Sequence, residues 1–217
     1  MIYTIDSDPP MAKPFLTDEA KEALTGAVRE VEASTCAELV VAVRARSGSY
    51  LHADLIAGIL VGLAALAFLL FSRWEFSLAW FVIDPVVAGL LGGLAASRFP
   101  RLRRVLTSRA ARRRRVETAA RSTFVEKRVH GTLMRAGILL YVSVLEREAA
   151  VVADIGLETL AADESWQRAV AAIEEGVRRK EDGVQIAERV RGLAAILAPA
   201  LPRAADDVDE LANEVCG

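Results

Sequence analysis

The sequence contains few of the residues from which catalytic and redox sites are usually built. Its 217 residues include two histidines and two cysteines. Cys36 and Cys216 lie far apart, so nothing in their spacing indicates a disulfide framework, and a reducing compartment fits. A nucleophile elbow, an H-E-x-x-H motif, a paired C-x-x-C and a G-x-x-x-x-G-K phosphate loop are also missing. No strong catalytic motif is therefore present.

What the sequence does have is two long apolar runs. Residues 55–71 carry no charge, and residues 76–96 are interrupted only by Asp84. Because a helix rises about 1.5 Å per residue, each run approaches the roughly 30 Å needed to cross a bilayer. A buried hairpin in a soluble core is the alternative, but 217 residues offer too little protein to wrap two helices that are apolar all round. We therefore predict a two-helix transmembrane hairpin over 51–97.

Glycines and one acid mark these predicted spans. Gly58 and Gly62 are four residues apart, as are Gly89 and Gly93, and this spacing favours close packing of the two helices. Asp84 precedes a proline inside the second span. An ionisable group at such a position suggests a function, although the Asp-Pro pair can also simply cap a kink.

Nine arginines without an intervening acid follow the hairpin in a basic juxtamembrane segment, 98–115. They are Arg98, Arg101, Arg103, Arg104, Arg109, Arg112, Arg113, Arg114 and Arg115. Basic flanks stay cytoplasmic, so we expect the inner (cytoplasmic) membrane, two spans, and both termini and the soluble domain in the cytoplasm. Anionic lipid headgroups explain such a segment at a span end, and without interleaved aromatic residues a nucleic-acid partner is not expected.

The flanks of the hairpin predict an α/β layer fold. Residues 1–15 are expected to be disordered, and Thr17 to cap a first helix. Valine-rich residues 38–44 and apolar residues 137–145 and 149–154 predict strands, and two helical stretches follow, built on Trp166 and Val184. Residues 16–50 and 116–215 are thus expected to form one domain, interrupted at a loop by the hairpin.

The order of several short motifs resembles the TPM domain family. They are TCAELVV at 35–41, AARSTF at 119–124, GILLYVS at 137–143, VADIG at 152–156 and PRAADDVDEL at 202–211. This resemblance implies a small Rossmann-like sheet flanked by helices, often attached to a membrane. Relatives in the family include thylakoid proteins tied to photosystem repair, one described as an acid phosphatase, and an animal receptor accessory protein.

The resemblance also makes four acids candidate metal ligands: Asp154, Asp206, Asp207 and Glu210. Carboxylates converging from two segments would suit Ca²⁺ or Mg²⁺, and such an ion can hold a phosphate and orient water. Asp209 departs from the family pattern, which has Asn there. The alternative is that these acids only cap a helix or face solvent. Arg135, just before a strand, is expected either to meet an anion or to pair with an acid, and pairing is favoured.

Two functions remain. The first is a membrane-anchored accessory domain that acts on or holds another membrane protein without turnover. The second is a metal-assisted phosphomonoester phosphatase. The missing catalytic constellation favours the accessory domain.

Overall fold

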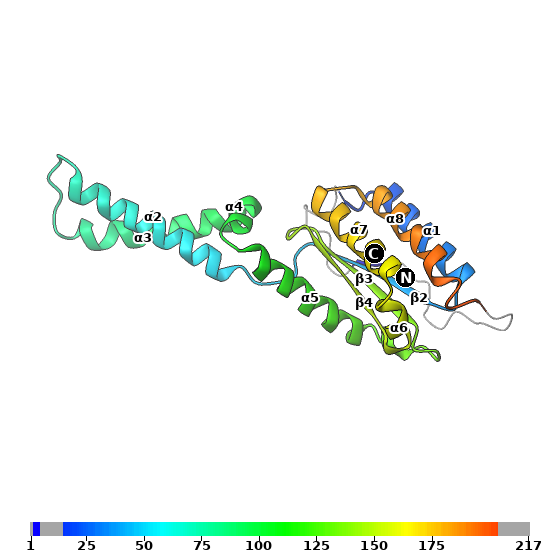
Figure 1. Ribbon diagram of the computed structural model, residues 1–217. Coiled ribbons are helices and arrows are strands. Elements are labelled where there is room, and N and C mark those ends of the chain that lie inside the picture. The colour runs from blue at the N-terminus through cyan, green and yellow to red at the C-terminus, as the bar shows by residue number, and fades with distance from the viewer. Residues whose placement is uncertain (1, 5–14, 204–217) are drawn as a thin grey trace. The chain divides into compact units, whose positions relative to one another are not determined.

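The computed structural model describes residues 2–4 and 15–203. The chain divides into two compact units (Figure 1). The α/β unit consists of residues 1–47 and 113–217, and the helical unit of residues 48–112. The helical unit contains the predicted hairpin, 51–97, together with most of the predicted basic segment, 98–115. Each unit is described by itself below.

A mixed four-stranded sheet forms the centre of the α/β unit, with strand order β1-β2-β3-β4. The strands are β1 (Ile2–Thr4), β2 (Glu38–Arg44), β3 (Gly137–Ser143) and β4 (Glu148–Ala153). β1, β2 and β3 run parallel, whereas β4 is antiparallel to β3. Every residue of β3 is buried, as the nearly continuous apolar sequence predicted for a central strand.

β1 corrects one expectation. Residues 1–15 were expected to be disordered, yet Ile2–Thr4 pair with Val41–Val43 of β2. The strand β2 would otherwise present unpaired N–H and C=O groups at the edge of the sheet, and the β-prone sequence Ile-Tyr-Thr can satisfy them. Residues 1 and 5–14 lie outside the described part of the chain.

The sheet joins the two sequence segments that flank the hairpin. β2 pairs with β3 in one continuous register, from Glu38 opposite Gly137 to Arg44 opposite Ser143. About 90 residues of chain separate the two strands, including the whole helical unit. The helical unit is therefore an insertion at the β2 end of a sheet whose strands come from both sides of it.

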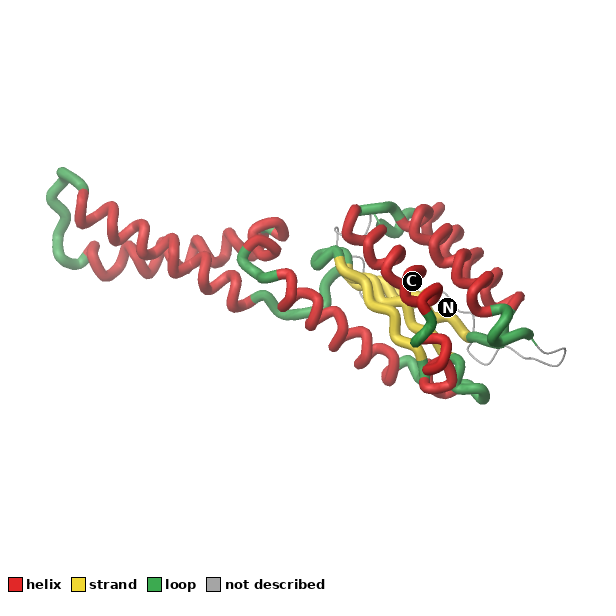
Figure 2. The backbone as a smooth tube through the Cα atoms, viewed as in Figure 1, coloured by secondary structure: helices red, strands yellow, loops and turns green. Residues whose placement is uncertain are grey.

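Helices cover both faces of this sheet (Figures 1 and 2). The helices of the α/β unit are α1 (Asp18–Ser34), α5 (Arg109–Glu126, which begins in the helical unit), α6 (Glu158–Ala161), α7 (Glu164–Arg179) and α8 (Gly183–Leu197). Two 3₁₀ turns, η1 (Val129–Gly131) and η2 (Ile155–Leu157), join them to the strands. The predicted cap of α1 is confirmed, because the Ala20 N–H donates to Thr17 Oγ1 at 3.1 Å.

The alternation of side chains along the strands divides the core into two layers. Leu39, Val41 and Leu140 belong to the larger layer, with apolar residues of α1, α7 and α8. Val40 and Leu139 point the other way and join the smaller layer with the buried residues of α5. Period-two alternation in a strand places successive side chains on opposite faces. Both faces of β2 and β3 are thus buried, which explains their valine- and leucine-rich sequences.

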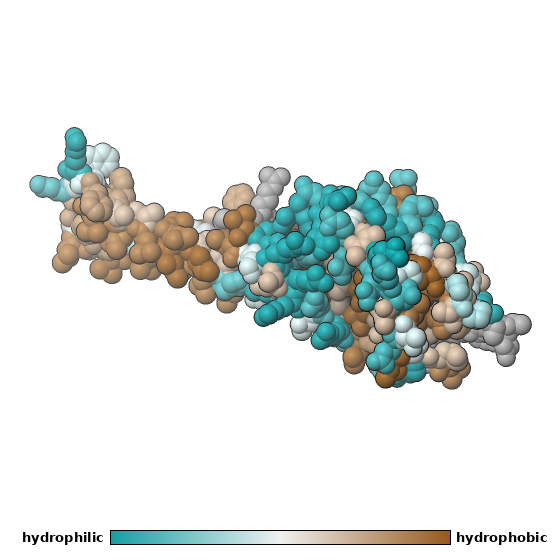
Figure 3. All heavy atoms as spheres, viewed as in Figure 1, coloured by the Kyte–Doolittle hydropathy of each residue, from teal (hydrophilic) through white to brown (hydrophobic). Residues whose placement is uncertain are grey.

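The helical unit contains α2 (Leu51–Phe71), α3 (Trp80–Arg98) and α4 (Pro100–Val105). α2 and α3 are long and apolar enough to cross a membrane, with mean hydropathies of 2.5 and 1.6 over their most apolar stretches. Most of their large apolar side chains are exposed, and Figure 3 shows this part of the chain covered with hydrophobic atoms. These properties are consistent with a two-span membrane protein. The second helix begins at Trp80, later than the apolar run from residue 76.

The basic segment has a structure that its sequence did not reveal. Residues 100–105 form α4, and a three-residue connection leads to Arg109 at the start of α5. The expected second soluble helix therefore begins in the arginines themselves.

Candidate functional site

Asp154 lies where β4 ends, as predicted, but its carboxylate is already engaged. Oδ1 accepts a hydrogen bond from the Ile155 N–H at 2.8 Å, which caps η2. Oδ2 lies 3.0 Å from Nε of Arg135, and the side chain of Asp154 is only 5% exposed. This contact is an ion pair without an aligned hydrogen bond, because Oδ2 has no hydrogen-bond partner among the described residues. The expectation that Arg135 pairs with an acid is confirmed.

The other predicted metal ligands, Asp206, Asp207 and Glu210, lie outside the described residues. Within residues 2–4 and 15–203, no group of three or more His, Cys, Asp or Glu side chains is placed to hold a metal ion. Asp154 by itself does not fit a Ca²⁺ or Mg²⁺ site, since such ions take six or more oxygen ligands and Arg135 already compensates its charge. The metal site and the phosphatase chemistry that depends on it stay predictions.

The loops around Asp154 carry three large apolar side chains that face solvent. Leu133 is 87% exposed, Met134 65% and Ile155 66%. The two loops adjoin, because the Gly156 N–H donates to the Arg135 carbonyl at 3.0 Å. A Cβ at position 156 would lie 2.5 Å from the Met134 carbonyl oxygen, so glycine permits this approach. We call Leu133, Met134 and Ile155 the apolar end patch.

Three exposed apolar side chains on adjoining loops indicate a binding surface, whereas a single exposed leucine would not. Isolated surface hydrophobics are normal, whereas several on adjoining loops mark a site of interaction. The Asp154–Arg135 ion pair holds these loops together, and Arg135 Nη1 also donates to the His130 carbonyl at 3.0 Å. The acid predicted as a metal ligand thus supports the loops that display the patch.

A second polar cluster lies at the opposite end of β3. Ser47 Oγ contacts Ser143 Oγ at 2.7 Å and Tyr141 Oη at 3.1 Å. The Ser47 N–H donates to Glu146 Oε1 at 3.0 Å, and the Ser143 hydroxyl donates to the other oxygen of the same carboxylate. Burial raises the pKa of Tyr141. These groups satisfy one another, and the cluster closes this end of the sheet.

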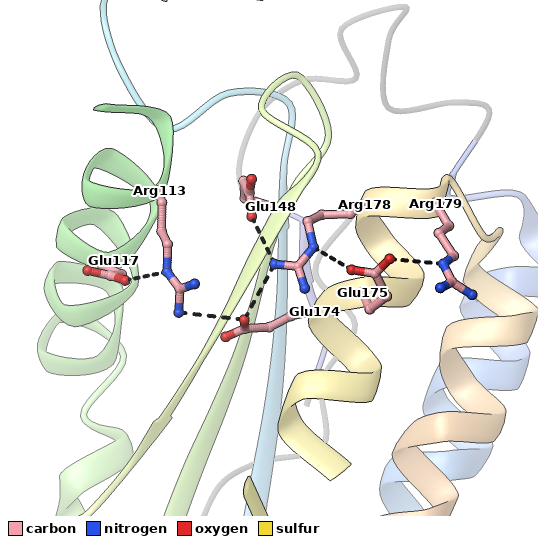
Figure 4. A network of polar contacts seen from close by, with 7 residues as sticks. All are labelled: Arg113, Glu117, Glu148, Glu174, Glu175, Arg178 and Arg179. Atoms are coloured by element: carbon pink, nitrogen blue, oxygen red, sulfur yellow. Dashed lines mark hydrogen bonds and ion pairs between the residues drawn. The ribbon is translucent and has the colours of Figure 1, made fainter. Parts of the chain in front are cut away.

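Arginines and glutamates form a network that links α5, β4 and α7 (Figure 4). Its members are Arg113, Glu117, Glu148, Glu174, Glu175, Arg178 and Arg179. Arg113 contacts Glu117 at 2.9 Å and Glu174 at 3.7 Å. Arg178 contacts Glu174 at 3.8 Å and Glu148, at the start of β4, at 3.7 Å. Arg113 was expected to face lipid headgroups; in the structure its guanidinium contacts Glu117 and Glu174 of the α/β unit.

Two neighbouring glutamates of this network titrate in opposite directions. Burial raises the pKa of Glu174, and the nearby guanidinium groups of Arg113 and Arg178 only partly offset it. Hydrogen bonds from Arg178 and Arg179 lower the pKa of Glu175. The Glu117 side chain, by accepting a hydrogen bond, raises the pKa of Arg113.

The four glycines predicted to pack the hairpin lie where α2 and α3 meet. A Cβ at Gly58 would lie 2.7 Å from the Gly89 carbonyl oxygen, and one at Gly62 would lie 2.7 Å from the Pro85 carbonyl oxygen. A Cβ at Gly93 would approach the Asp54 carbonyl oxygen to 3.1 Å. A further contact, which the sequence analysis missed, places Gly92 against the side chain of Val61. Each glycine therefore allows backbone approach that alanine would obstruct.

Asp84 lies within α3, one residue before Pro85, and is half-buried. The carbonyl of Pro85 approaches Gly62 of α2, so the Asp-Pro pair belongs to the packed part of the hairpin. The structure describes the position of Asp84 and assigns it no function.

The arginines predicted to bind lipid headgroups differ in their exposure and in the groups that they contact. Arg103 forms a bidentate ion pair with Asp54 at the start of α2, at 2.9 and 2.6 Å, and this partner raises the pKa of Arg103. Arg112 Nη1 donates to the carbonyls of Arg104 at 2.8 Å and Thr107 at 2.7 Å. Arg98, Arg109 and Arg114 are exposed, and Arg104 and Arg115 are partly buried. The side chain of Arg101 lies outside the described part.

Comparison with known proteins identifies a fold and no family. No family model matches the chain, and no curated protein matches it. The NMR structure of the BA42 protein from the psychrophilic bacterium Bizionia argentinensis sp. nov. is similar, with a TM-score of 0.55 and 18% sequence identity over 92% of each chain. The likeness is one of fold. It supports the mixed α/β architecture, while membership of the TPM family and a Rossmann-like sheet stay predictions.

Proposed function

We propose that this chain is a membrane-anchored accessory protein whose α/β unit binds another membrane protein without turnover. Two helices are apolar and long enough to anchor it. The observation that carries the proposal is the apolar end patch, three exposed side chains on loops held in place by an ion pair and a glycine contact. Interfaces bury such side chains at their centre and leave polar groups at the rim.

The proposal also includes where the α/β unit lies in the cell and which domain family it belongs to. The arginine-rich end of the hairpin favours the cytoplasmic side of the inner membrane for the α/β unit. The ordered motifs favour a TPM-like domain with a Rossmann-like sheet. The animal receptor accessory protein in that family favours a binding role for this domain.

Site-specific photo-crosslinking in cells tests this function. A photoreactive amino acid at position 155 should yield a discrete adduct with a membrane protein, since Ile155 is 66% exposed in the apolar end patch. Position 167 on α7, also exposed, is the matched control and should yield none. Met134→Asp should abolish the adduct at position 155, because burying an unpaired carboxylate at an interface is costly. Equal labelling at both positions would contradict the proposal.

A further inference from the structure

The connection between α4 and α5 contains buried polar atoms that no described residue satisfies. Thr107 is only 3% exposed, and its Oγ1 has no hydrogen-bond partner. Nε of Arg112 is also buried without a partner. Buried polar groups are normally paired, and leaving one unpaired destabilises the fold. A ligand at this corner would satisfy both of these atoms.

Both atoms belong to the same corner of the helical unit. Arg112 Nη1 donates to the carbonyl of Thr107 itself at 2.7 Å, so the guanidinium lies against the residue that carries the unsatisfied hydroxyl. A second bond to the Arg104 carbonyl at 2.8 Å fixes the guanidinium beneath the end of α4. The hydroxyl and Nε–H are both donors, and a ligand with several acceptor oxygens would complement them.

The electrostatics of this corner favour an anion. Residues 98–112 include six arginines and no acid. The 18-residue α5 begins beside Thr107 and has no acidic residue in its first turn, so the positive end of its dipole is uncompensated there. Asp54, which also belongs to this unit, is neutralised by its bidentate pair with Arg103.

The surroundings of the corner favour a lipid as the source of that anion. Phe99, just before α4, and Val105, the last residue of α4, are 62% and 82% exposed. α4 follows directly on the end of the span helix α3, and the Arg103–Asp54 pair ties it to the start of α2. Apolar side chains beside arginines at a span end suit the boundary between headgroups and acyl chains.

We propose that Thr107 and Arg112 form a binding site for the phosphate of an anionic phospholipid headgroup at the α4–α5 corner. The inference rests on the proposed membrane anchoring and adds to it a defined site, distinct from general attraction by the basic segment. The Thr107 hydroxyl and the Arg112 Nε–H donate to phosphate oxygens, while Arg112 Nη1 keeps its bonds to the two carbonyls.

Native mass spectrometry of the full chain in detergent, titrated with phosphatidylglycerol, tests the site. Thr107→Val keeps shape and charge but removes the donor, so it should weaken binding about tenfold, as loss of a hydrogen bond to a charged group does. Thr118→Val is the control, because Thr118 is exposed on α5 and its hydroxyl donates to the Arg114 carbonyl. Equal affinity of the two variants would overturn the proposal.

Charge variants separate a site from a diffuse attraction. Arg112→Gln should weaken binding at least as much as Thr107→Val, whereas Arg114→Gln removes the same charge from an exposed position and should cost no more than about fivefold. If the two arginine variants lose affinity equally, no defined site exists. Inorganic phosphate that competes as well as the lipid would overturn the assignment to a headgroup.

The outcomes also separate this inference from the proposed function. A chain that fails to fractionate with membranes contradicts the anchoring itself. Suppose instead that the chain is anchored and crosslinks through position 155, while the Thr107→Val and Thr118→Val variants bind phosphatidylglycerol equally well. That result contradicts the lipid site alone.

Discussion

At the scale of single residues, the role of Asp154 decides whether its substitution destabilises the protein. A metal ligand and a structural cap predict opposite results. A free carboxylate in a metal site is repelled by its acidic neighbours, so its removal leaves the apo protein no less stable. In the structure, however, Asp154 caps η2 and pairs with Arg135. Removal should therefore destabilise the fold.

Asp154→Ala is expected to lower the free energy of unfolding by about 1–3 kcal/mol, the cost of losing a cap and a buried charge contact. Arg135→Gln should cost less, because half of that side chain is exposed. Urea unfolding of the full chain in detergent measures both. A rise of the midpoint with Ca²⁺ or Mg²⁺ that Asp154→Asn abolishes would instead support the predicted metal site.

At the scale of helices and strands, the hairpin depends on close approach of α2 and α3. Gly58→Ala and Gly62→Ala each place a Cβ 2.7 Å from a carbonyl oxygen of the facing helix. Backbone cannot yield as a flexible side chain does, so each substitution should destabilise the hairpin by about 1–3 kcal/mol. Unfolding in a titration with SDS, followed by circular dichroism, measures this.

Ala64→Leu serves as the control for the glycine variants, because Ala64 lies exposed on the same helix and has room for a larger side chain. It should leave the SDS midpoint unchanged. Equal sensitivity at positions 58 and 64 would mean that the two helices do not pack through the glycine face.

The network of Figure 4 predicts a specific dependence of stability on pH. The pKa of Glu174 is raised in the folded state above its ordinary value of 4.5, so the folded state binds the proton more tightly. The contribution of Glu174 to the free energy of unfolding is therefore complete below pH 4.5. It is lost as the pH rises through the pKa of the folded state. Glu174→Gln should remove this fall of the free energy of unfolding with rising pH. Urea unfolding at a series of pH values from 4.5 upward measures it.

Glu175→Gln should change the dependence of stability on pH in the opposite direction from Glu174→Gln. The pKa of Glu175 is lowered from 4.5, so its contribution is present above that value and is lost as the pH falls through the folded pKa. Two profiles that shift in the same direction would contradict the surroundings assigned to these glutamates.

The elements show what the sequence could and could not predict. Residues 38–44 form β2 with the predicted bounds, because a valine-rich run buried on both faces has a strong local signal. The cap at Thr17 was equally local. By contrast, β1 depends on an edge supplied by β2, and α4 lies in a segment whose arginines were interpreted only as charge. The partners of Arg103, Arg112 and Arg113 depend on tertiary contacts, which no local pattern encodes.

At the scale of the whole chain, the continuous pairing of β2 with β3 makes the α/β unit separable from its insertion. Replacing residues 50–112 with a short Gly/Ser linker should give a soluble protein that unfolds in one cooperative transition, because the described core residues of this unit all come from outside the replaced segment. Size-exclusion chromatography and urea unfolding measure this. Two transitions, or none, would contradict a single sheet joined across the insertion.

The proposed orientation makes a second prediction for the whole chain. A reporter fused after Gly217 should be active only in the cytoplasm, and one inserted at residues 73–75, between α2 and α3, only outside it. Substituting neutral residues for the exposed Arg98, Arg109 and Arg114 should increase the fraction with inverted orientation. An exported C-terminus in the unaltered chain would contradict the cytoplasmic placement of the α/β unit.

The pairing of β2 with β3 also sets an order of events during synthesis. β2 leaves the ribosome about 90 residues before its partner, a delay of about 5–20 s at the usual rates of elongation. During this interval the helical unit emerges, while β2 still lacks the strand that completes its pairing. In the membrane-anchored protein proposed above, the domain would therefore mature only after the hairpin is inserted, and a stalled insertion would leave a nascent chain exposed to quality-control proteases.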